Sequence, residues 1–158
     1  MTPFLLRLIT AVCFIGIGVG GYTLINKTLL KRANRALTGL EAQQQNTPAI
    51  LYFTTPDCMP CRTTQRPAIN RLLETTGEQV QLIEVDASVQ PKLAESWGVL
   101  SVPTTFVIDS DGQARQVNLG VTSTEKLLDQ LEQAAGRPFV KNPLLKMRTR
   151  EAGAPGTD

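Results

Sequence analysis

The sequence predicts an α/β fold, a sheet flanked by helices, with an apolar helix ahead of it. Short apolar runs alternate with segments of helical periodicity between residues 49 and 136. This alternation is typical of βαβ packing with a parallel component. Asp111-Gly112 separates the last two apolar runs and is a strong hairpin signal. The uncharged segment 8–25 precedes all of these elements.

Apolar runs and turn-forming residues place each expected element along the chain. Strands are expected at residues 49–53, 80–86, 104–108 and 113–119, the last two joined by a turn at 109–112. A first helix is expected at 58–75, interrupted by Pro67 and ended by Gly77. A second is expected at 88–97, capped by Ser88 and followed by Gly98. A third begins after a cap at Thr122 or Ser123. In the last helix, Leu127, Leu128 and Leu131 form an apolar stripe. Trp97 and Phe106 are expected in the core.

Composition excludes several classes of function. The chain has 158 residues and a net charge of +2, which favours one domain with appendages. No basic stripe is interleaved with aromatic residues, so we expect no nucleic-acid partner. The chain contains no histidine. This excludes Ser/His and Cys/His nucleophilic catalysis and metal sites that need an imidazole.

Segment 8–25 is interpreted as a membrane anchor. Eighteen helical residues span about 27 Å, close to the hydrocarbon thickness of about 30 Å. A cleaved signal peptide is the main alternative, but no clean Ala-x-Ala site precedes the basic residues that follow. A lipoprotein signal at Cys13 is a further alternative, which the preceding Val12 fits poorly. We therefore expect an uncleaved, single-pass anchor within residues 1–26.

The remaining segments divide by composition. Residues 27–47 are interpreted as a polar, solvated stalk, with anionic-lipid contact as the alternative. Residues 48–136 form the folded domain, and 137–158 are a basic and then Gly/Pro-rich tail expected to be disordered. Arg7 precedes the anchor, whereas four basic residues follow it: Lys27, Lys31, Arg32 and Arg35. This charge bias favours a cytosolic position for the domain.

Cys58-Met59-Pro60-Cys61 is the stretch with the clearest chemistry. It lies between a predicted strand and a predicted helix, which places Cys58 at a helix N-terminus. The unpaired N–H groups and the positive end of the helix dipole favour the thiolate there. Cys61 returns to the same helical face, so its sulfur can attack a mixed disulfide formed at Cys58.

Three separated features together resemble the thioredoxin family. They are the C-x-x-C at a strand-to-helix junction, Ser101-Val102-Pro103-Thr104 just before a later strand, and Gly120 after the hairpin strand. The resemblance covers roughly residues 36–136. It implies a thioredoxin-like fold, in which Pro103 would be cis. Tethered members of this family often work outside the cytoplasmic membrane, which conflicts with the charge bias and leaves the face of the domain open.

The resemblance also implies thiol–disulfide exchange with protein substrates and an upstream dithiol donor. Cys58 would attack and Cys61 would resolve, with no cofactor beyond this redox pair and no metal. Met59, Pro60, Val102 and Pro103 would support the substrate beside the sulfurs. The expected function is a membrane-tethered thiol–disulfide oxidoreductase acting as a reductase.

Departures from the family pattern narrow this expectation. Asp57 stands where typical members have tryptophan, and its charge should raise the pKa of Cys58. Tyr52 and Leu82 occupy the places of the buried carboxylate and its lysine neighbour. Pro67 falls one residue later after the second cysteine than is usual. Slower or narrower disulfide reduction than in a general thioredoxin is therefore expected.

Two alternatives use the same two thiols without turnover. One is an adaptor whose dithiol switches binding. The other is a Cu(I)- or Zn(II)-handling protein, because thiolates suit both ions. Only two sulfur ligands and no histidine are available at this site for such an ion.

Overall fold

The computed structural model describes residues 2–36 and 46–139. Its elements run in the order α1 (Thr2–Ala36), β1 (Ala49–Thr54), η2 (Cys61–Gln65), α2 (Arg66–Thr76), η3 (Gly77–Gln79), β2 (Gln81–Asp86), α3 (Pro91–Ser96), β3 (Thr104–Ile108), β4 (Ala114–Leu119) and α4 (Thr124–Ala135). The four strands form one sheet in the order β2-β1-β3-β4. β1 is parallel to β2, while β3 is antiparallel to both β1 and β4, which makes the sheet mixed.

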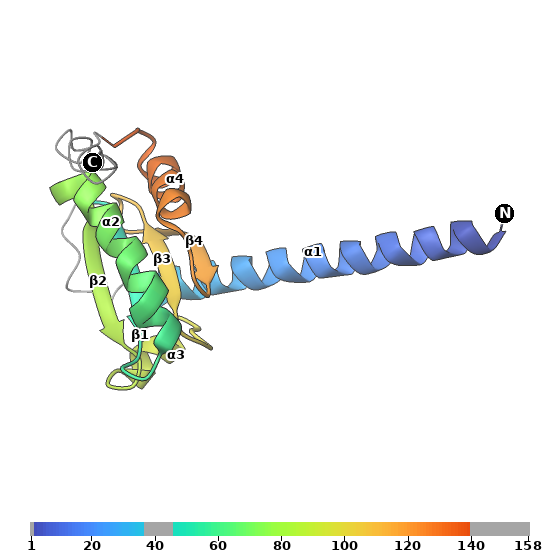
Figure 1. The fold of residues 1–158 in the computed structure, drawn as a ribbon, viewed down its shortest axis with the longest axis horizontal. Helices are drawn as coiled ribbons and strands as arrows, with labels where there is room; N and C mark the ends of the chain where they lie inside the picture. The colour runs from blue at the N-terminus through green and yellow to red at the C-terminus, as the bar shows by residue number, and fades with distance from the viewer. Residues whose placement is uncertain (1, 37–45, 140–158) are drawn as a thin grey trace, which may run out of the picture.

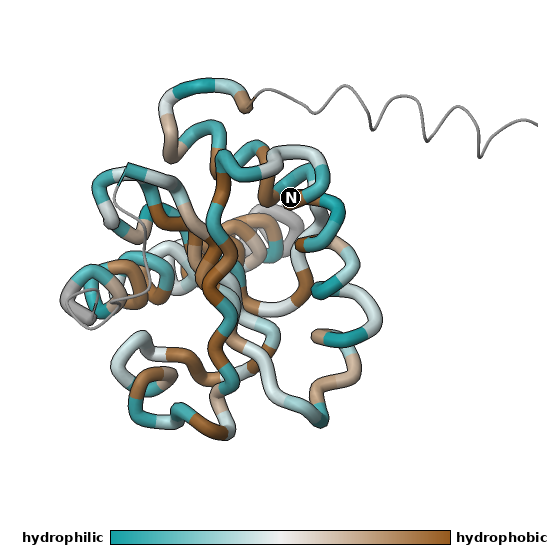
Figure 2. The backbone as a smooth tube through the Cα atoms, turned by 90° about the vertical axis from the view of Figure 1, so that its left-hand side faces the viewer, coloured by the Kyte–Doolittle hydropathy of each residue, from teal (hydrophilic) through white to brown (hydrophobic). Residues whose placement is uncertain are grey.

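Helices α2 and α4 cover one face of the sheet (Figure 1). Successive side chains of a strand point to opposite faces. Ile50 and Tyr52 of β1 accordingly join the cluster under α2 and α4. Leu127 and Leu131 of the predicted stripe are fully buried there, whereas Leu128 is only partly buried. The apolar colour of Figure 2 follows the central strands between the helices.

The opposite face of the sheet packs against α3 and the last turns of α1. Leu51 and Phe53 of β1 point into this second cluster. The rings of Phe53, Trp97 and Phe106 meet there in tilted and edge-to-face contacts, with ring centroids 4.9–6.2 Å apart. The expectation that Trp97 and Phe106 belong to the core is confirmed, since both are fully buried.

Element boundaries follow the predicted ones closely, with one correction at α3. The helix expected at 88–97 begins at Pro91, and its N-terminal capping position is Gln90, without a side-chain cap. Ser88 instead donates its hydroxyl to the Asp86 carboxylate at 2.5 Å. Proline fits the first helical turn because it lacks an N–H that would need a partner there, so the helix starts at Pro91. Ser123 does cap α4, as expected, by accepting the Lys126 N–H at 3.3 Å.

α1 corrects the interpretation of a solvated stalk. Within residues 27–36, Leu29 is 6% exposed and Ala33 is fully buried in the cluster with Trp97. The Asn34 side chain accepts the Ala114 N–H at 2.7 Å and donates to the Ala114 carbonyl at 3.5 Å. The last turns of α1 are therefore part of the domain. Residues 37–45 of the expected linker lie outside the described residues.

The N-terminal part of α1 projects away from the domain (Figure 1). The stretch Arg7–Asn34 is long and apolar enough to cross a membrane, and its most apolar window is wholly unburied. A signal sequence near an N-terminus can also meet these criteria of length and apolar composition. At the other end of the chain, Phe139 is 4% exposed against the α2–α4 cluster, so the expected tail begins later than residue 137. Residues 140–158 lie outside the described residues.

Asn34→Ala is expected to destabilise the domain by about 1 kcal/mol, because the Ala114 N–H loses its acceptor in a part-buried hydrogen bond. Urea denaturation of the full chain in detergent micelles measures the change. Lys31→Ala, at an exposed position of the same helix, is the control and should change stability by less than about 0.5 kcal/mol. Equal effects of the two substitutions would contradict the docking of α1.

Candidate active site

Cys58 lies where the loop after β1 enters the helical segment. Its N–H donates to the Thr55 carbonyl at 3.2 Å, and its carbonyl accepts the Arg62 N–H at 3.2 Å. Met59 and Pro60 are already helical. The Cys61 N–H donates to the Cys58 sulfur at 3.2 Å. The Cys58 side chain thus occupies the acceptor position of an N-terminal cap, as the sequence predicted from the strand-to-helix junction.

Cys58 and Cys61 form a disulfide, with their Cα atoms 5.3 Å apart. The two sulfur-bearing residues differ in access: Cys58 is 9% exposed and Cys61 is fully buried. Cys58 is therefore the more accessible of the two residues.

Cys61 begins a π-helical turn rather than an α-helical one. The Arg66 N–H donates to the Cys61 carbonyl, five residues back, within η2. Pro67 follows at once, in the first turn of α2. Proline cannot donate a backbone hydrogen bond and crowds the preceding turn. The wider π turn holds one residue more than an α turn, which accommodates the late position of Pro67.

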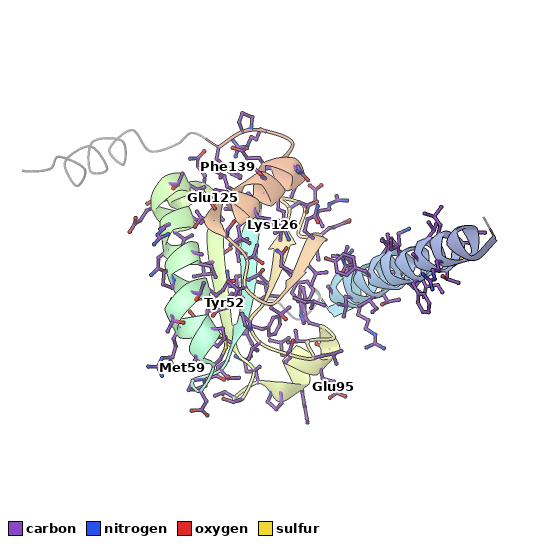
Figure 3. The ribbon with its side chains drawn as sticks, turned by 45° about the vertical axis from the view of Figure 1, so that its right-hand side comes forward. Tyr52, Met59, Glu95, Glu125, Lys126 and Phe139 are labelled. Atoms are coloured by element: carbon purple, nitrogen blue, oxygen red, sulfur yellow. A yellow bond between two sulfur atoms is a disulfide. The ribbon has the colours of Figure 1, made fainter. Side chains whose placement is uncertain are left out.

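Tyr52 of β1 belongs to the buried cluster between α2 and the sheet that also holds both cysteines (Figure 3). Its hydroxyl donates to the Cys61 carbonyl at 3.3 Å. Burial raises the pKa of the Tyr52 phenol, so the hydroxyl stays protonated at neutral pH. Leu82, half-buried, packs against the same cluster. Tyr52 therefore brings a phenol rather than a carboxylate to Cys61, and Leu82 adds an apolar side chain to the same cluster.

The loop before β3 forms a second wall of the site. The Val102–Pro103 peptide bond is cis, as the resemblance implied. Pro103 is buried, and its carbonyl accepts the Gly120 N–H at 2.8 Å. Gly120 has a φ of 89°, a left-handed conformation that glycine adopts without strain. Val102 is half-buried against the cluster that holds both cysteines, so the structure brings Val102, Pro103 and the cysteine pair together.

Apolar side chains stay exposed around this wall. Met59 is 59% exposed and Leu100 is 91% exposed. Leu100 and Val102 line a hollow of about 510 Å³ that reaches Thr55 of the cysteine loop. Pro60 and Asp57 are also exposed on the loop itself. Exposed apolar side chains thus lie near Cys58, together with charged ones: Asp57 on the loop, and Arg32 and Glu95 in the hollow.

Gln65 is a buried residue that the sequence analysis missed. Its side chain accepts the Thr122 N–H at 2.7 Å and donates to the Thr122 carbonyl at 3.3 Å. This pair ties the π turn to the loop after Gly120. The two residues are 57 positions apart, so no local sequence signal indicated the contact. Across the helix, Arg66 forms an ion pair with Glu84 of β2.

Potential metal ligands do not gather at this site or elsewhere in the described chain. Within residues 2–36 and 46–139, no group of three or more His, Cys, Asp or Glu side chains is placed to hold a metal ion.

Comparisons with known proteins agree with this geometry. The sequence profile of the thioredoxin family matches residues 38–133. The chain belongs to the thioredoxin family. Thioredoxin 1 of Synechococcus elongatus is 26% identical over 92 residues, covering 58% of this chain and 84% of that protein. The thioredoxin of Listeria monocytogenes is 31% identical over 70 residues, covering 44% of this chain and 66% of that protein.

The fold is confirmed by solved structures as well. The crystal structure of a thioredoxin from Nicotiana alata superimposes with a TM-score of 0.53 at 20% identity, covering 65% of this chain and 86% of that one. The fold is thioredoxin-like, as expected. With its cysteine pair able to form a disulfide, this member of the family is a protein thiol–disulfide oxidoreductase. Members of the family work with thiol or disulfide substrates and a reductase donor.

Gln65→Leu is expected to destabilise the protein by about 1–3 kcal/mol, because the Thr122 N–H is left unpaired in a buried position. Urea denaturation of the oxidised full chain in detergent measures the loss. Asn70→Ala, on the exposed side of α2, is the matched control with an expected change below about 0.5 kcal/mol. A Gln65→Leu protein as stable as the control would show that the contact is dispensable.

Asp57→Asn is expected to lower the pKa of Cys58 in the reduced protein, because a negative charge next to the sulfur opposes the thiolate. The pH dependence of iodoacetamide alkylation reports this pKa. Asp111→Asn removes the same charge from the hairpin turn, at the end of β3 opposite Pro103, and should leave the alkylation profile unchanged. An unchanged profile for Asp57→Asn as well would remove Asp57 from the account of the site.

Proposed function

We propose that this thioredoxin is a membrane-tethered reductase of protein disulfides, with Cys58 as the nucleophile and Cys61 as the resolving thiol. The hydrogen bond from the Cys61 N–H to the Cys58 sulfur carries the proposal. In the reduced protein this donor, at the start of a helix, favours the thiolate of Cys58 over that of Cys61. The difference in exposure between the two residues supports the same order of attack.

In the first step, the Cys58 thiolate attacks one sulfur of a substrate disulfide. A mixed disulfide forms, and the other substrate sulfur leaves as a thiolate. Pro60 supplies no backbone N–H in this turn, which leaves the Cys61 N–H as the donor that faces the sulfur. The Tyr52 hydroxyl holds the Cys61 carbonyl, so the helix start keeps its position beneath the reacting sulfurs.

In the second step, Cys61 loses its proton and attacks the Cys58 sulfur, and the substrate leaves as a dithiol. Two electrons have then passed from the protein to the substrate, and the Cys58–Cys61 disulfide awaits an external dithiol donor. The Tyr52 phenol keeps its proton at neutral pH, so it cannot accept the proton from Cys61. Water or the departing substrate thiolate takes it instead, which supports the expectation of slower turnover than in a general thioredoxin.

An extended substrate segment fits against the apolar surface beside the pair. Met59 and Leu100 offer exposed apolar area on two sides of Cys58, and Val102 lies between the cluster and the hollow. Main-chain groups of Val102 can pair with such a segment, while the apolar side chains around it tolerate varied sequences. The pair needs no further cofactor for this exchange.

The membrane anchor in this proposal is segment 8–25 of α1. Its large apolar side chains are exposed, Phe14 and Ile17 by more than 70% each. Contiguous apolar surface of this size is found in lipid or against a partner. The uncharged run is long enough to span the hydrocarbon core as a helix.

Trapping tests the proposed exchange directly. Cys61→Ser leaves the mixed disulfide unresolved, so the full chain expressed in cells should carry disulfide-linked protein adducts at Cys58, detected by non-reducing gels and mass spectrometry. Cys58→Ser is the matched control and should carry at least about tenfold fewer adducts, because Cys61 is buried. A Cys61→Ser protein without adducts would instead favour the redox-switched adaptor.

A further inference from the structure

One uninterrupted helix connects the apolar segment to the catalytic domain. α1 runs from Thr2 to Ala36 as a single α-helix. Its described side chains before Asn26 are exposed, and its last turns are packed on the sheet and α3. A long helix without a break transmits orientation from one end to the other, unlike a flexible linker.

The docked end of α1 is held by complementary contacts of three kinds. Leu29 and Ala33 are buried in the cluster with Trp97. Asn34 exchanges two hydrogen bonds with the backbone of Ala114. Gly98 provides the space for Leu29: a Cβ atom at Gly98 would lie 2.8 Å from Leu29 Cδ2. These contacts hold the domain in one orientation against the last turns of α1.

Very little chain separates the apolar run from the docked turns. Four helical residues lead from Ile25, the end of the uncharged run, to Leu29, a rise of about 6 Å. Arg32 lies about 10 Å beyond Ile25 by the same measure. With the uncharged run in a bilayer, the domain rests directly on the membrane surface.

Measured along the axis of α1, the cysteine pair lies at about the height of these docked turns. Arg32 of α1 lines the same hollow as Thr55 and Val102, which adjoin the cysteines. In Figure 3, Met59 marks the reactive end of the domain, which points across the direction of α1 rather than along it. The site accordingly opens sideways, roughly parallel to a bilayer crossed by α1. Its height above the hydrocarbon core is on the order of 10–20 Å.

We propose that α1 acts as a rigid post, and that the preferred substrate is a disulfide in a second membrane-anchored protein, held within this narrow band above the bilayer. The inference rests on the proposed reductase and its membrane anchor. In the exchange, the Cys58/Cys61 dithiol gives two electrons to the partner's disulfide. The partner leaves as a dithiol and the chain as its disulfide. A partner confined to the same band meets the site at a higher effective concentration than one that reaches it from solution.

The test uses the reduced full chain in vesicles of phosphatidylcholine and phosphatidylglycerol. Single-pass reporter peptides carry one cystine loop on a helical Glu-Ala-Ala-Ala-Lys spacer, at about 15 Å or about 45 Å above the bilayer. We expect the first reporter to be reduced at least about tenfold faster than the second. Equal rates for the two reporters would overturn the proposal.

A matched variant removes only the rigid connection. Twenty Gly-Ser residues inserted after Ile25 leave Leu29, Ala33 and Asn34 docked and give the domain a reach of about 25 Å. The ratio of the two reporter rates should then fall toward one. A ratio that stays near ten would show that the height preference does not come from α1 and would also overturn the proposal.

Soluble insulin separates this inference from the function on which it rests. Both proteins should reduce insulin at the same rate, because the insertion lies outside the catalytic domain. Flotation of the vesicles reports whether the chain is anchored. Failure to reduce insulin, or failure to float, overturns the proposed function and the inference together. Normal insulin reduction and flotation with equal reporter rates overturns the inference alone.

Discussion

The 3.2 Å hydrogen bond from the Cys61 amide to the Cys58 sulfur is the contact around which this thioredoxin is arranged. It exists because a buried strand delivers the chain to the start of a helix, where N–H groups lack partners within the helix. The sheet fixes one end of the connecting loop, and the packing of α2 fixes the other. The Tyr52 hydroxyl holds the helix start by donating to the Cys61 carbonyl. The Gln65 side chain ties it to the neighbouring loop by donating to the Thr122 carbonyl.

The π turn allows the helix to contain Pro67 while this hydrogen bond is kept. Pro67 would disturb a regular α-helix one turn after the cysteines, and the wide turn at Cys61–Gln65 absorbs the extra residue. The same turn presents the Gln65 side chain to Thr122. The position of Pro67, one residue later than in the family pattern, is thus compensated by the π turn next to it. The cysteine pair, the loop at Pro103 and Gly120 keep their expected proximity.

Much of the fold could be predicted from the sequence, because strands and helix ends have local signals. The continuous apolar run of β1, which is buried at every position, the glycine after α2 and the Asp-Gly turn are all signals contained within a few residues. The docked turns of α1 carry no such signal, because Ala33 is small and Asn34 is polar, so the sequence predicts a stalk there. Gln65 has no local signal either, since its partner, Thr122, is distant in sequence. Ser88 predicts a cap although the helix starts at Pro91, because both residue types suit helix beginnings.

The tyrosine beneath the disulfide has a consequence for the proton chemistry of the couple. A buried acid that titrates near neutrality would bind or release a proton whenever the pair changed its oxidation state. Tyr52 holds its proton through that whole range, since burial raises its pKa. The midpoint potential should consequently change its slope with pH only where the two thiols themselves ionise, without a further bend contributed by the residue below them.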